Sequence, residues 1–120
     1  MPVISIVDDD PSIRRALRRL LQSAGYVVET FASAYEFLAS AALGHSACLV
    51  LDIRLDGMTG FELQERLAAD RNALRIIFIT AHDDAVTRER VERAGAAGYL
   101  PKPFDAAALL AAVASAAGPA

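Results

Sequence analysis

Five short apolar segments alternate with segments of helical pattern along the chain. The apolar segments, which we interpret as strands, are residues 3–7, 26–31, 47–51, 75–80 and 97–100. The helical segments that follow them are residues 11–24, 34–42, 60–71, 85–94 and 105–116. Repeated strand–helix units join parallel strands through right-handed crossovers. The alternation therefore predicts an α/β fold with a doubly wound, five-stranded parallel sheet and five helices.

Residues at the segment boundaries support this division. Ser33 and Thr59 each precede a helical segment and are followed three residues later by glutamate, which is the pattern of a capping box. Gly44 is expected just beyond the end of the second helix. Residues 48–51 and 76–79 are almost entirely apolar, as is typical of central strands that are buried on both faces of a parallel sheet.

Composition indicates one soluble globular domain over residues 1–120, with a possible truncated linker at residues 117–120. Of the 120 residues, 54% are hydrophobic and 22% charged, and the net charge of −3 argues against non-specific nucleic-acid binding. The sequence contains neither an apolar run of membrane-spanning length nor a recognisable signal peptide. The single cysteine, Cys48, lies in an apolar run and is expected in the core. We therefore expect a cytoplasmic protein without a membrane contact.

Three consecutive aspartates, Asp8, Asp9 and Asp10, follow the first predicted strand. Adjacent carboxylates repel each other unless a cation neutralises them, and Mg²⁺ prefers oxygen ligands of this kind. Asp10 before Pro11 is explained by a helix N-cap alone. Asp8 and Asp9 have no such explanation, and ligands of open α/β sheets bind at the carboxyl ends of the strands. The segment therefore suggests a metal site.

Other polar residues follow the remaining strands. Asp52 ends the third strand and Thr80 the fourth, while Lys102 follows the fifth between two prolines. Lys102 is the only lysine among 12 basic residues, and a compact ammonium can neutralise a carboxylate or a phosphoryl oxygen. The alternatives are a surface lysine in a proline-rich turn and a threonine that merely ends a strand. We also expect a cis bond between Lys102 and Pro103.

The combination suits phosphoryl transfer to a carboxylate. Such transfer depends mainly on positioning and on charge stabilisation. Asp52 is the expected nucleophile, and Mg²⁺ at Asp8, Asp9 and Asp52 would supply positive charge together with Lys102. Thr80 offers its hydroxyl to a phosphoryl oxygen.

These residues resemble the receiver domains of bacterial two-component response regulators, in particular the FixJ-like branch. The resemblance covers almost the whole chain. It rests on the motifs Val7-Asp8-Asp9-Asp10, Leu51-Asp52-Ile53-Arg54-Leu55, Gly57-Met58-Thr59-Gly60, Ile79-Thr80-Ala81-His82 and Ala94-Gly95-Ala96-Ala97-Gly98-Tyr99-Leu100-Pro101-Lys102-Pro103-Phe104. The resemblance implies a flavodoxin-like fold with strand order 2-1-3-4-5.

The resemblance also implies a chemistry. A sensor histidine kinase would phosphorylate Asp52, with Mg²⁺ as the cofactor and Mn²⁺ as a substitute. Asp9 and Asp52 would hold the ion directly, Asp8 largely through water, and Arg54 through its backbone carbonyl. Thr80 and Lys102 would contact the phosphoryl group. The domain would be no enzyme beyond its own phosphotransfer and autodephosphorylation.

Switching is a further implication. Thr80 and Tyr99 occupy the positions of the switch pair, and the surface formed by residues 85–94, 97–100 and 105–116 would change on phosphorylation. That surface would contact an effector domain or partner, or form a phosphorylation-dependent homodimer, so that the protein regulates transcription or another output. Arg54 and His82 are expected to tune the lifetime of the phosphorylated state.

Two departures from the family pattern and one basic segment need separate mention. Asp56 stands where a proline is frequent and adds a carboxylate to its loop, and Pro101 precedes the lysine where an ordinary residue is common. The first helix carries the four arginines Arg14, Arg15, Arg18 and Arg19. Their role is either kinase docking or simple solvation of a helix face.

Two rival functions stay open at this point. Asp8-x-Asp10-x-Ser12 resembles the nucleophile motif of haloacid-dehalogenase-like phosphatases, and Asp83-Asp84 could match the later acidic pair. In that family, however, the lysine should precede the acidic pair, whereas Lys102 follows it. The other rival is a scaffold of the same fold that acts without phosphorylation.

Overall fold

The computed structural model describes residues 2–120 and forms a five-stranded parallel sheet with the order β2-β1-β3-β4-β5. The strands are β1 (Val3–Val7), β2 (Val27–Phe31), β3 (Cys48–Asp52), β4 (Arg75–Thr80) and β5 (Gly98–Pro101). The sequence prediction of a flavodoxin-like sheet with order 2-1-3-4-5 is confirmed. The strand bounds agree with the predicted ones to within one residue.

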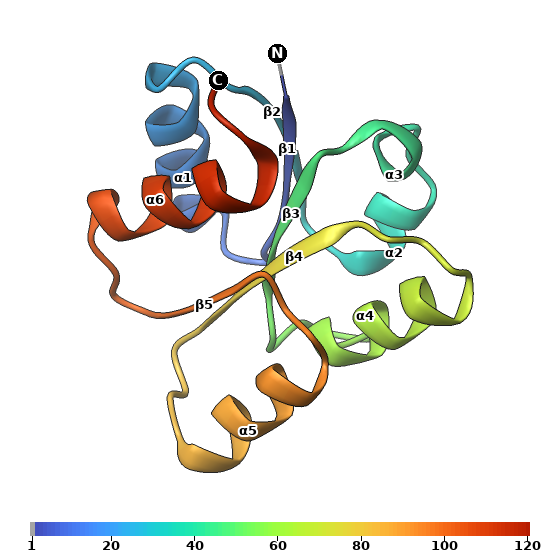
Figure 1. Cartoon of the computed structure of the whole chain (residues 1–120). Coiled ribbons are helices and arrows are strands. Elements are labelled where there is room, and N and C mark those ends of the chain that lie inside the picture. The colour runs from blue at the N-terminus through green and yellow to red at the C-terminus, as the bar shows by residue number, and fades with distance from the viewer. Residues whose placement is uncertain (1) are drawn as a thin grey trace.

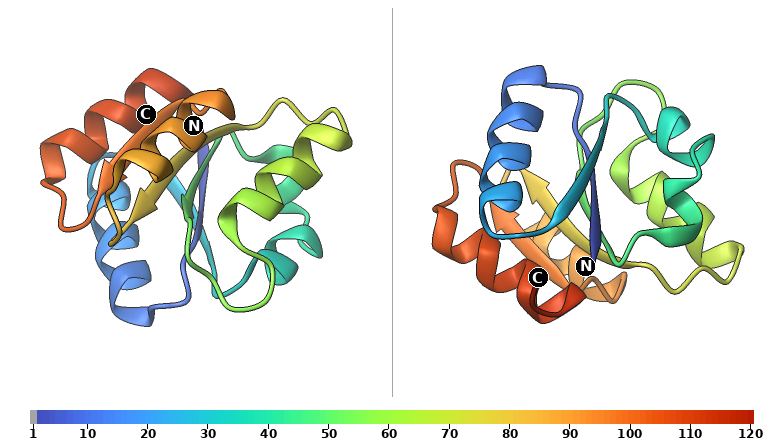
Figure 2. Two further views of the ribbon diagram at one scale, coloured as in Figure 1. Left: turned by 90° about the horizontal axis from the view of Figure 1, so that it is seen from below. Right: turned by 90° about the horizontal axis from the view of Figure 1, so that it is seen from above.

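Six helices flank the sheet, as Figure 1 shows. They are α1 (Pro11–Ser23), α2 (Ala34–Leu38), α3 (Ala42–His45), α4 (Gly60–Ala69), α5 (Ala85–Arg93) and α6 (Ala106–Ala117). The two end-on views show α1 and α6 on one side of the sheet and α2, α3 and α4 on the other (Figure 2). Among residues 2–120, no helix has both the length and the apolar character needed to cross a bilayer.

The core has two halves, one on each face of the sheet. On the first face, Leu17 and Leu21 of α1 and Leu109 of α6 pack against buried strand residues such as Ile4 and Ile77. On the second face, side chains from α2 to α5, such as Phe61 of α4, pack against a different set of strand residues, which includes Val7, Leu49, Leu51 and Phe78. β3 is buried at every position and β4 at every position after Arg75, as predicted for central strands. Cys48 lies in the core, where burial raises the pKa of its thiol to about 12.

The prediction of five helices is wrong in one place. The segment predicted as one helix over residues 34–42 forms two short helices, α2 and α3. Ser40 lies between them, and its hydroxyl accepts a hydrogen bond from the amide of Ala42 at 3.0 Å. A serine side chain that bonds to the backbone in this way competes with a continuous helix. Gly44 accordingly lies inside α3 and not beyond a helix end.

Local hydrogen bonds fix the helix starts that matter for the sheet edge. Asp10 caps α1 through the amide of Ser12, with Pro11 as the first helical residue, as predicted. Thr59 and Glu62 form the complete capping box of α4. At α2 only half of the expected box forms, because Ser33 accepts from the amide of residue 36 without a reciprocal bond.

Candidate functional site

The carboxyl ends of four neighbouring strands bring the predicted site residues to one edge of the sheet. Val7 pairs with Leu51 and Asp52 with Ile79, so that the residues after β1 lie beside the end of β3. Thr80 pairs with Pro101, which places Lys102 next to the end of β4. The amide of Lys102 donates to the carbonyl of Thr80 at 2.6 Å and ties the turn after β5 to this edge.

Three carboxylates converge there. Asp8, Asp9 and Asp52 each offer an oxygen, and these oxygens all lie within 4.8 Å of one another. Asp8 is fully buried and Asp52 is 5% exposed, whereas Asp9 is exposed to solvent. The cluster has carboxylate oxygens on its buried side and is open to solvent on the other side. Such a site suits a hard divalent cation that keeps part of its water shell. Asp10 is not among the three, because its side chain caps α1.

Lys102 is the counter-ion of the two buried carboxylates. Its Nζ lies 2.9 Å from Asp8 Oδ2 and 3.3 Å from Asp52 Oδ2, and its side chain is 16% exposed. Burial disfavours the ammonium form, but the hydrogen bond to Asp8 and the charges of both carboxylates outweigh it, so the pKa of Lys102 is raised. The lysine is therefore charged throughout the neutral range. The bond between Lys102 and Pro103 is cis, as predicted.

Asp52 is the carboxylate whose protonation is most affected by the site. Burial, followed by the charge of Asp8, raises the pKa of Asp52 to about 6, against the opposing effect of Lys102. A backbone hydrogen bond from the amide of Arg54 to Asp52 Oδ1, at 3.2 Å, also favours the ionised form. At neutral pH Asp52 is thus mostly ionised and has few protein partners besides Lys102. These are the properties that a carboxylate nucleophile requires.

Asp8 is held more firmly than Asp52. Its Oδ1 accepts from the amide of Asp10 at 2.9 Å, while its Oδ2 accepts from Lys102. The backbone carbonyl of Asp8 accepts from Arg14 Nη1 at 2.7 Å. One of the four arginines of α1 therefore supports the acidic loop. The other three, Arg15, Arg18 and Arg19, are exposed.

Thr80 is 1% exposed at the end of β4. Its Oγ1 accepts a hydrogen bond from the amide of His82 at 3.0 Å. The side chains of Arg54 and His82 are exposed, and so is Asp56, which lies outside the group of converging carboxylates. The structure brings Asp8, Asp9, Asp52 and Lys102 into one cluster. Thr80 ends the neighbouring strand β4, and Arg54 and His82 lie in the segments that follow Asp52 and Thr80.

Two features of this region escaped the sequence analysis. The first is a hydrogen-bonded group around Tyr99, whose phenol donates to Asp83 Oδ1 at 2.9 Å. Arg88 donates two hydrogen bonds to the same carboxylate, from Nε to Oδ1 at 2.6 Å and from Nη2 to Oδ2 at 3.0 Å. Burial and the bond to Asp83 raise the pKa of Tyr99 to about 12. The sequence carried no local signal for this group, since Asp83 and Arg88 are five residues apart and Tyr99 lies in a different element.

The second is the role of Gly60 at the start of α4. A Cβ at this position would lie 2.5 Å from the backbone carbonyl oxygen of Asp52 and 2.9 Å from the Cα of Ile53. Only glycine permits this approach, and the amide of Gly60 donates to the carbonyl of Ile53 at 2.9 Å. The first residue of α4 therefore packs in direct contact with the backbone of Asp52, the candidate nucleophile. The sequence showed the glycine but not the contact.

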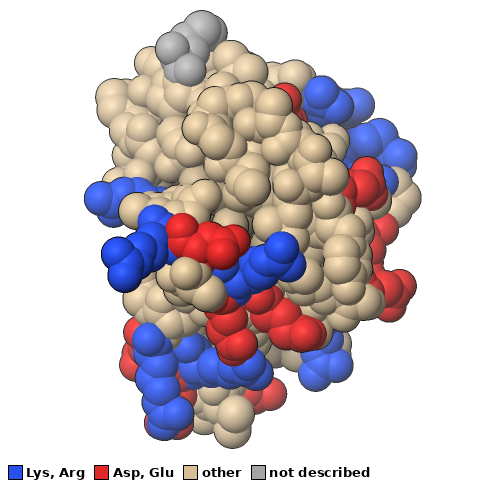
Figure 3. Space-filling view, turned by 90° about the vertical axis from the view of Figure 1, so that its right-hand side faces the viewer, with Lys and Arg blue, Asp and Glu red and all other residues tan. Residues whose placement is uncertain are grey.

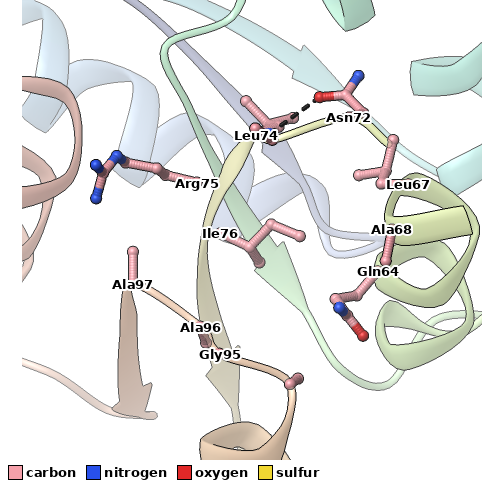
Figure 4. Close-up of a pocket in the computed structure, with 12 residues that line it drawn as sticks. Gln64, Leu67, Ala68, Asn72, Leu74, Arg75, Ile76, Gly95, Ala96 and Ala97 are labelled. Carbon is pink, nitrogen blue, oxygen red and sulfur yellow. Dashed lines mark hydrogen bonds between the residues drawn. The ribbon is translucent and has the colours of Figure 1, made fainter. Parts of the chain in front are cut away.

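A hollow at the opposite edge of the sheet lacks such chemistry (Figure 4). It has a volume of about 390 Å³ and lies where β4 begins, between α4 and the segment that precedes β5. Its lining includes Leu67, Ile76 and several alanines, with Gln64, Asn72 and Arg75 as polar residues, and none of the lining residues is acidic. The carboxylate cluster is therefore the candidate site.

Comparison with known proteins shows the family to which the chain belongs. The family described as the response regulator receiver domain matches residues 4–114. Nodulation protein W of Bradyrhizobium diazoefficiens is 42% identical over 114 residues, which are 95% of this chain and 50% of that protein. Transcriptional regulatory protein FixJ of Azorhizobium caulinodans is 37% identical over 110 residues, or 92% of this chain and 52% of that protein.

Solved structures show the same relationship. The response regulator StyR superposes with a TM-score of 0.89 at 48% identity, covering 97% of this chain and 59% of that one. The crystal structure of FixJ-N gives a TM-score of 0.88 at 32% identity, covering 98% and 94%. The chain spans about half the length of the curated relatives named above. The chain belongs to the family of response regulator receiver domains of two-component systems.

Proposed function

We propose that Asp52 accepts a phosphoryl group from a sensor histidine kinase. One oxygen of Asp52 forms a bond to phosphorus while the bond from phosphorus to the imidazole nitrogen of the donor breaks, and the released imidazole takes a proton from solvent. The observation that carries the proposal is the position of Asp52 at a strand end, within reach of two further carboxylates and of the Lys102 ammonium. Its pKa of about 6 keeps it ionised at neutral pH.

The three carboxylates fit a divalent cation of the Mg²⁺ type, for which Mn²⁺ would substitute. Asp9 and Asp52 would hold the ion directly together with the backbone carbonyl of Arg54, and Asp8 would act largely through water. The convergence of the carboxylate oxygens within 4.8 Å supports this assignment. When bound, the ion supplies positive charge that neutralises the transferring phosphoryl group.

Lys102 and Thr80 would receive the phosphoryl group. The ammonium already lies between Asp8 and Asp52, so it can turn toward a phosphoryl oxygen on Asp52 without leaving Asp8. The hydroxyl of Thr80 now accepts from the amide of His82 and would donate to another phosphoryl oxygen. A movement of Thr80 toward Asp52 would follow from that bond.

The kinase would dock beside α1. An apolar groove of about 280 Å³ runs between Ile13, Leu17 and Leu20 of α1 and Phe104 after β5, and it ends at Lys102. A helix bundle seated there would bring its phosphohistidine to the acidic edge. The exposed arginines Arg15, Arg18 and Arg19 lie elsewhere on α1, outside the lining of the groove, and favour an acidic surface on a partner that also contacts this helix.

The output surface would be the one formed by α5, β5 and α6. Tyr99 lies in β5 and so belongs to this surface, and we infer that Thr80 and Tyr99 change position together. An effector domain or partner, or a second copy of this chain, would bind the altered surface. As in the transcriptional regulators among its relatives, the receiver would control a further domain, and the proposed role is signalling and not turnover of an external substrate.

Direct nucleic-acid binding by this domain is not part of the proposal. Basic and acidic side chains are interspersed on the face of the molecule seen in Figure 3, without an extended area of one sign. The net charge is −3. A location in the cytoplasm remains a prediction from the sequence.

The phosphatase alternative loses its support. In that motif the second aspartate would share the site with the first, whereas Asp10 caps α1 and lies outside the carboxylate cluster. The chain also belongs to the receiver family.

The test is phosphorylation by acetyl phosphate in the presence of Mg²⁺, followed by intact-mass measurement and peptide mapping. We expect one added phosphoryl group on Asp52 in the wild type and none in Asp52→Asn. Asp56→Asn is the matched control, because it removes an exposed carboxylate from the adjacent loop, outside the cluster, and should be phosphorylated normally. Equal phosphorylation of Asp52→Asn and the wild type would overturn the assignment.

A further inference from the structure

The Asp83 carboxylate connects Tyr99 to the helix that follows the Thr80 loop. Asp83 Oδ1 accepts from the phenol of Tyr99 and from Arg88 Nε, and Oδ2 accepts from Arg88 Nη2. The bidentate contact fixes the carboxylate plane, as is usual for arginine and carboxylate. The Asp83 side chain is 30% exposed, so the carboxylate is only partly covered by its two partners.

The helix cap that follows Asp83 also fixes its position. The next residue, Asp84, caps α5 by accepting from the amide of Thr87 at 2.7 Å. Arg88 lies one turn further along the same helix, so the cap and the arginine together define where the Asp83 carboxylate can lie. The bonds of Asp83 to Arg88 and Tyr99 hold its pKa below the ordinary value.

We propose that Asp83, oriented by Arg88, is a latch that holds Tyr99 in the position seen here, with its phenol on the Asp83 carboxylate. The proposal rests on the proposed function, since it concerns the equilibrium through which phosphorylation would change the output surface. Asp83 is a positioning residue, because it acts through Tyr99 and does not contact the site. Rotation of the Tyr99 ring away from this position, here called release, requires its phenol to leave the carboxylate.

The latch also couples to the site through the chain. Asp83 lies three residues after Thr80, in the same short segment whose His82 amide bonds to the threonine hydroxyl. A movement of Thr80 toward Asp52 would draw this segment away from Tyr99 and weaken the latch. Phosphorylation would then favour the release of Tyr99, and the latch would oppose this release in the resting state.

Removal of the latch should therefore release Tyr99 without any phosphoryl group. In Asp83→Ala we expect the Tyr99 ring to populate the released position roughly two- to fivefold more than in the wild type, the range for one solvent-accessible charged contact. The measurement is the intensity of nuclear Overhauser effects from the Tyr99 ring to the Thr80 methyl group in metal-free, unphosphorylated protein. Arg88→Ala should change the same signals in the same direction but less, because Asp83 keeps its bond to Tyr99.

Glu89→Ala is the matched control. It removes an exposed carboxylate of α5 that pairs with Arg93 and not with Tyr99, and it should leave the ring signals unchanged. Overlapping amide spectra outside this region show that each variant is folded. Unchanged ring signals in a folded Asp83→Ala protein would overturn the latch.

A second readout separates the latch from the proposed function. We expect Asp83→Ala to be phosphorylated by acetyl phosphate roughly two- to fivefold faster than the wild type, because less of the protein must leave the latched state. Wild-type protein that takes no phosphoryl group on Asp52 would refute the proposed function, while the ring signals would still decide on the latch. A faster rate with unmoved ring signals would also refute the latch.

Discussion

At the scale of single residues, the site depends on one ammonium that is shared by two buried carboxylates. Lys102 contacts both Asp8 and Asp52, and neither carboxylate has another charged partner among the ion pairs of residues 2–120. The same lysine lowers the pKa of Asp52, which burial and Asp8 raise. Lys102 therefore stabilises the fold and favours the ionised form of Asp52, the proposed nucleophile.

Replacing the lysine should expose this dual role. We expect Lys102→Met to lower the free energy of unfolding near neutral pH by about 2 kcal/mol, less than the roughly 3–5 kcal/mol of a fully buried broken pair, because solvent reaches the amine. Lys102→Arg keeps the charge and should lose less. The measurement is urea unfolding without divalent cations.

The deficit of Lys102→Met should depend on pH. In the folded protein the pKa of Asp52, about 6, lies above its ordinary value of 3.8. Ionisation of Asp52 therefore lowers the free energy of unfolding. This loss is complete above about pH 6 and absent below about pH 3.8. Without Lys102 that loss is larger. The deficit should thus be largest at about pH 7 and smaller at about pH 5. A deficit that is equal or larger in acid would contradict the account.

Asp9 and Asp10 are neighbours with different roles. Asp9→Asn should weaken Mg²⁺ binding roughly tenfold or more and slow phosphorylation, because it removes a carboxylate ligand. Asp10→Asn should leave binding unchanged, since asparagine caps a helix as well as aspartate does. Calorimetric titration with Mg²⁺ compares them. Equal affinities in the two variants would show that the ion is not bound by this cluster.

Arg54 and His82 lie in the segments that follow Asp52 and Thr80, and both are exposed. We expect them to screen phosphorus from water approaching opposite the Asp52 oxygen. Arg54→Ala and His82→Ala should then lose the phosphoryl group faster, with little dependence on pH. Slower loss in His82→Ala, with a wild-type rate that rises as imidazole deprotonates, would instead make His82 a participant in hydrolysis.

At the scale of helices and strands, α4 is the element most closely fitted to the site. Its first residue, Gly60, leaves no space for a Cβ against the backbone of Asp52. Gly60→Ala should lower the free energy of unfolding by roughly 1–3 kcal/mol, as other overpacked positions do, and should slow phosphorylation by displacing Asp52. Urea unfolding and the acetyl phosphate assay measure the two effects.

Gly44→Ala is the control for that substitution. A Cβ at Gly44, which lies in α3, would have no neighbouring atom within 4 Å, so alanine should stabilise the protein by roughly 0.5–1 kcal/mol. Destabilisation by both substitutions, or by neither, would contradict the argument from close approach.

Features set by a pattern along the sequence could be predicted, whereas features set by single side-chain hydrogen bonds could not. Alternating apolar and amphipathic segments predicted the parallel sheet, and the sheet alone brings Asp52, Thr80 and Lys102 to one edge. The break between α2 and α3 was missed, because the alanines around Ser40 favour a continuous helix and the sequence does not show that the Ser40 hydroxyl bonds to the backbone. The contact of Asp83 with Tyr99 was missed too, since it depends on the path of a loop and on side-chain rotamers that no local pattern specifies.

At the scale of the whole molecule, the fold places the candidate site and the proposed output surface in different parts of the sheet. The carboxylates lie at the ends of β1 and β3, whereas α5 and α6, which belong to the proposed output surface, lie on either side of the edge strand β5 (Figure 1). The segment from Thr80 to Asp84 joins the two, because it begins at the site and ends at the cap of α5. A phosphoryl group on Asp52 can therefore act on a distant surface through one short stretch of chain.

The most direct test of this account is chemical-shift mapping of the wild type with Mg²⁺ and beryllofluoride, which mimics the phosphoryl group. The predicted result is a set of shifted amides that begins at Asp52, Thr80 and Lys102 and continues through residues 81–84 to Tyr99 and the surface of α5, β5 and α6. Asp52→Asn should show none of these shifts. Changes confined to the carboxylate pocket, or the same changes in Asp52→Asn, would contradict the claim that this domain is a switch operated from Asp52.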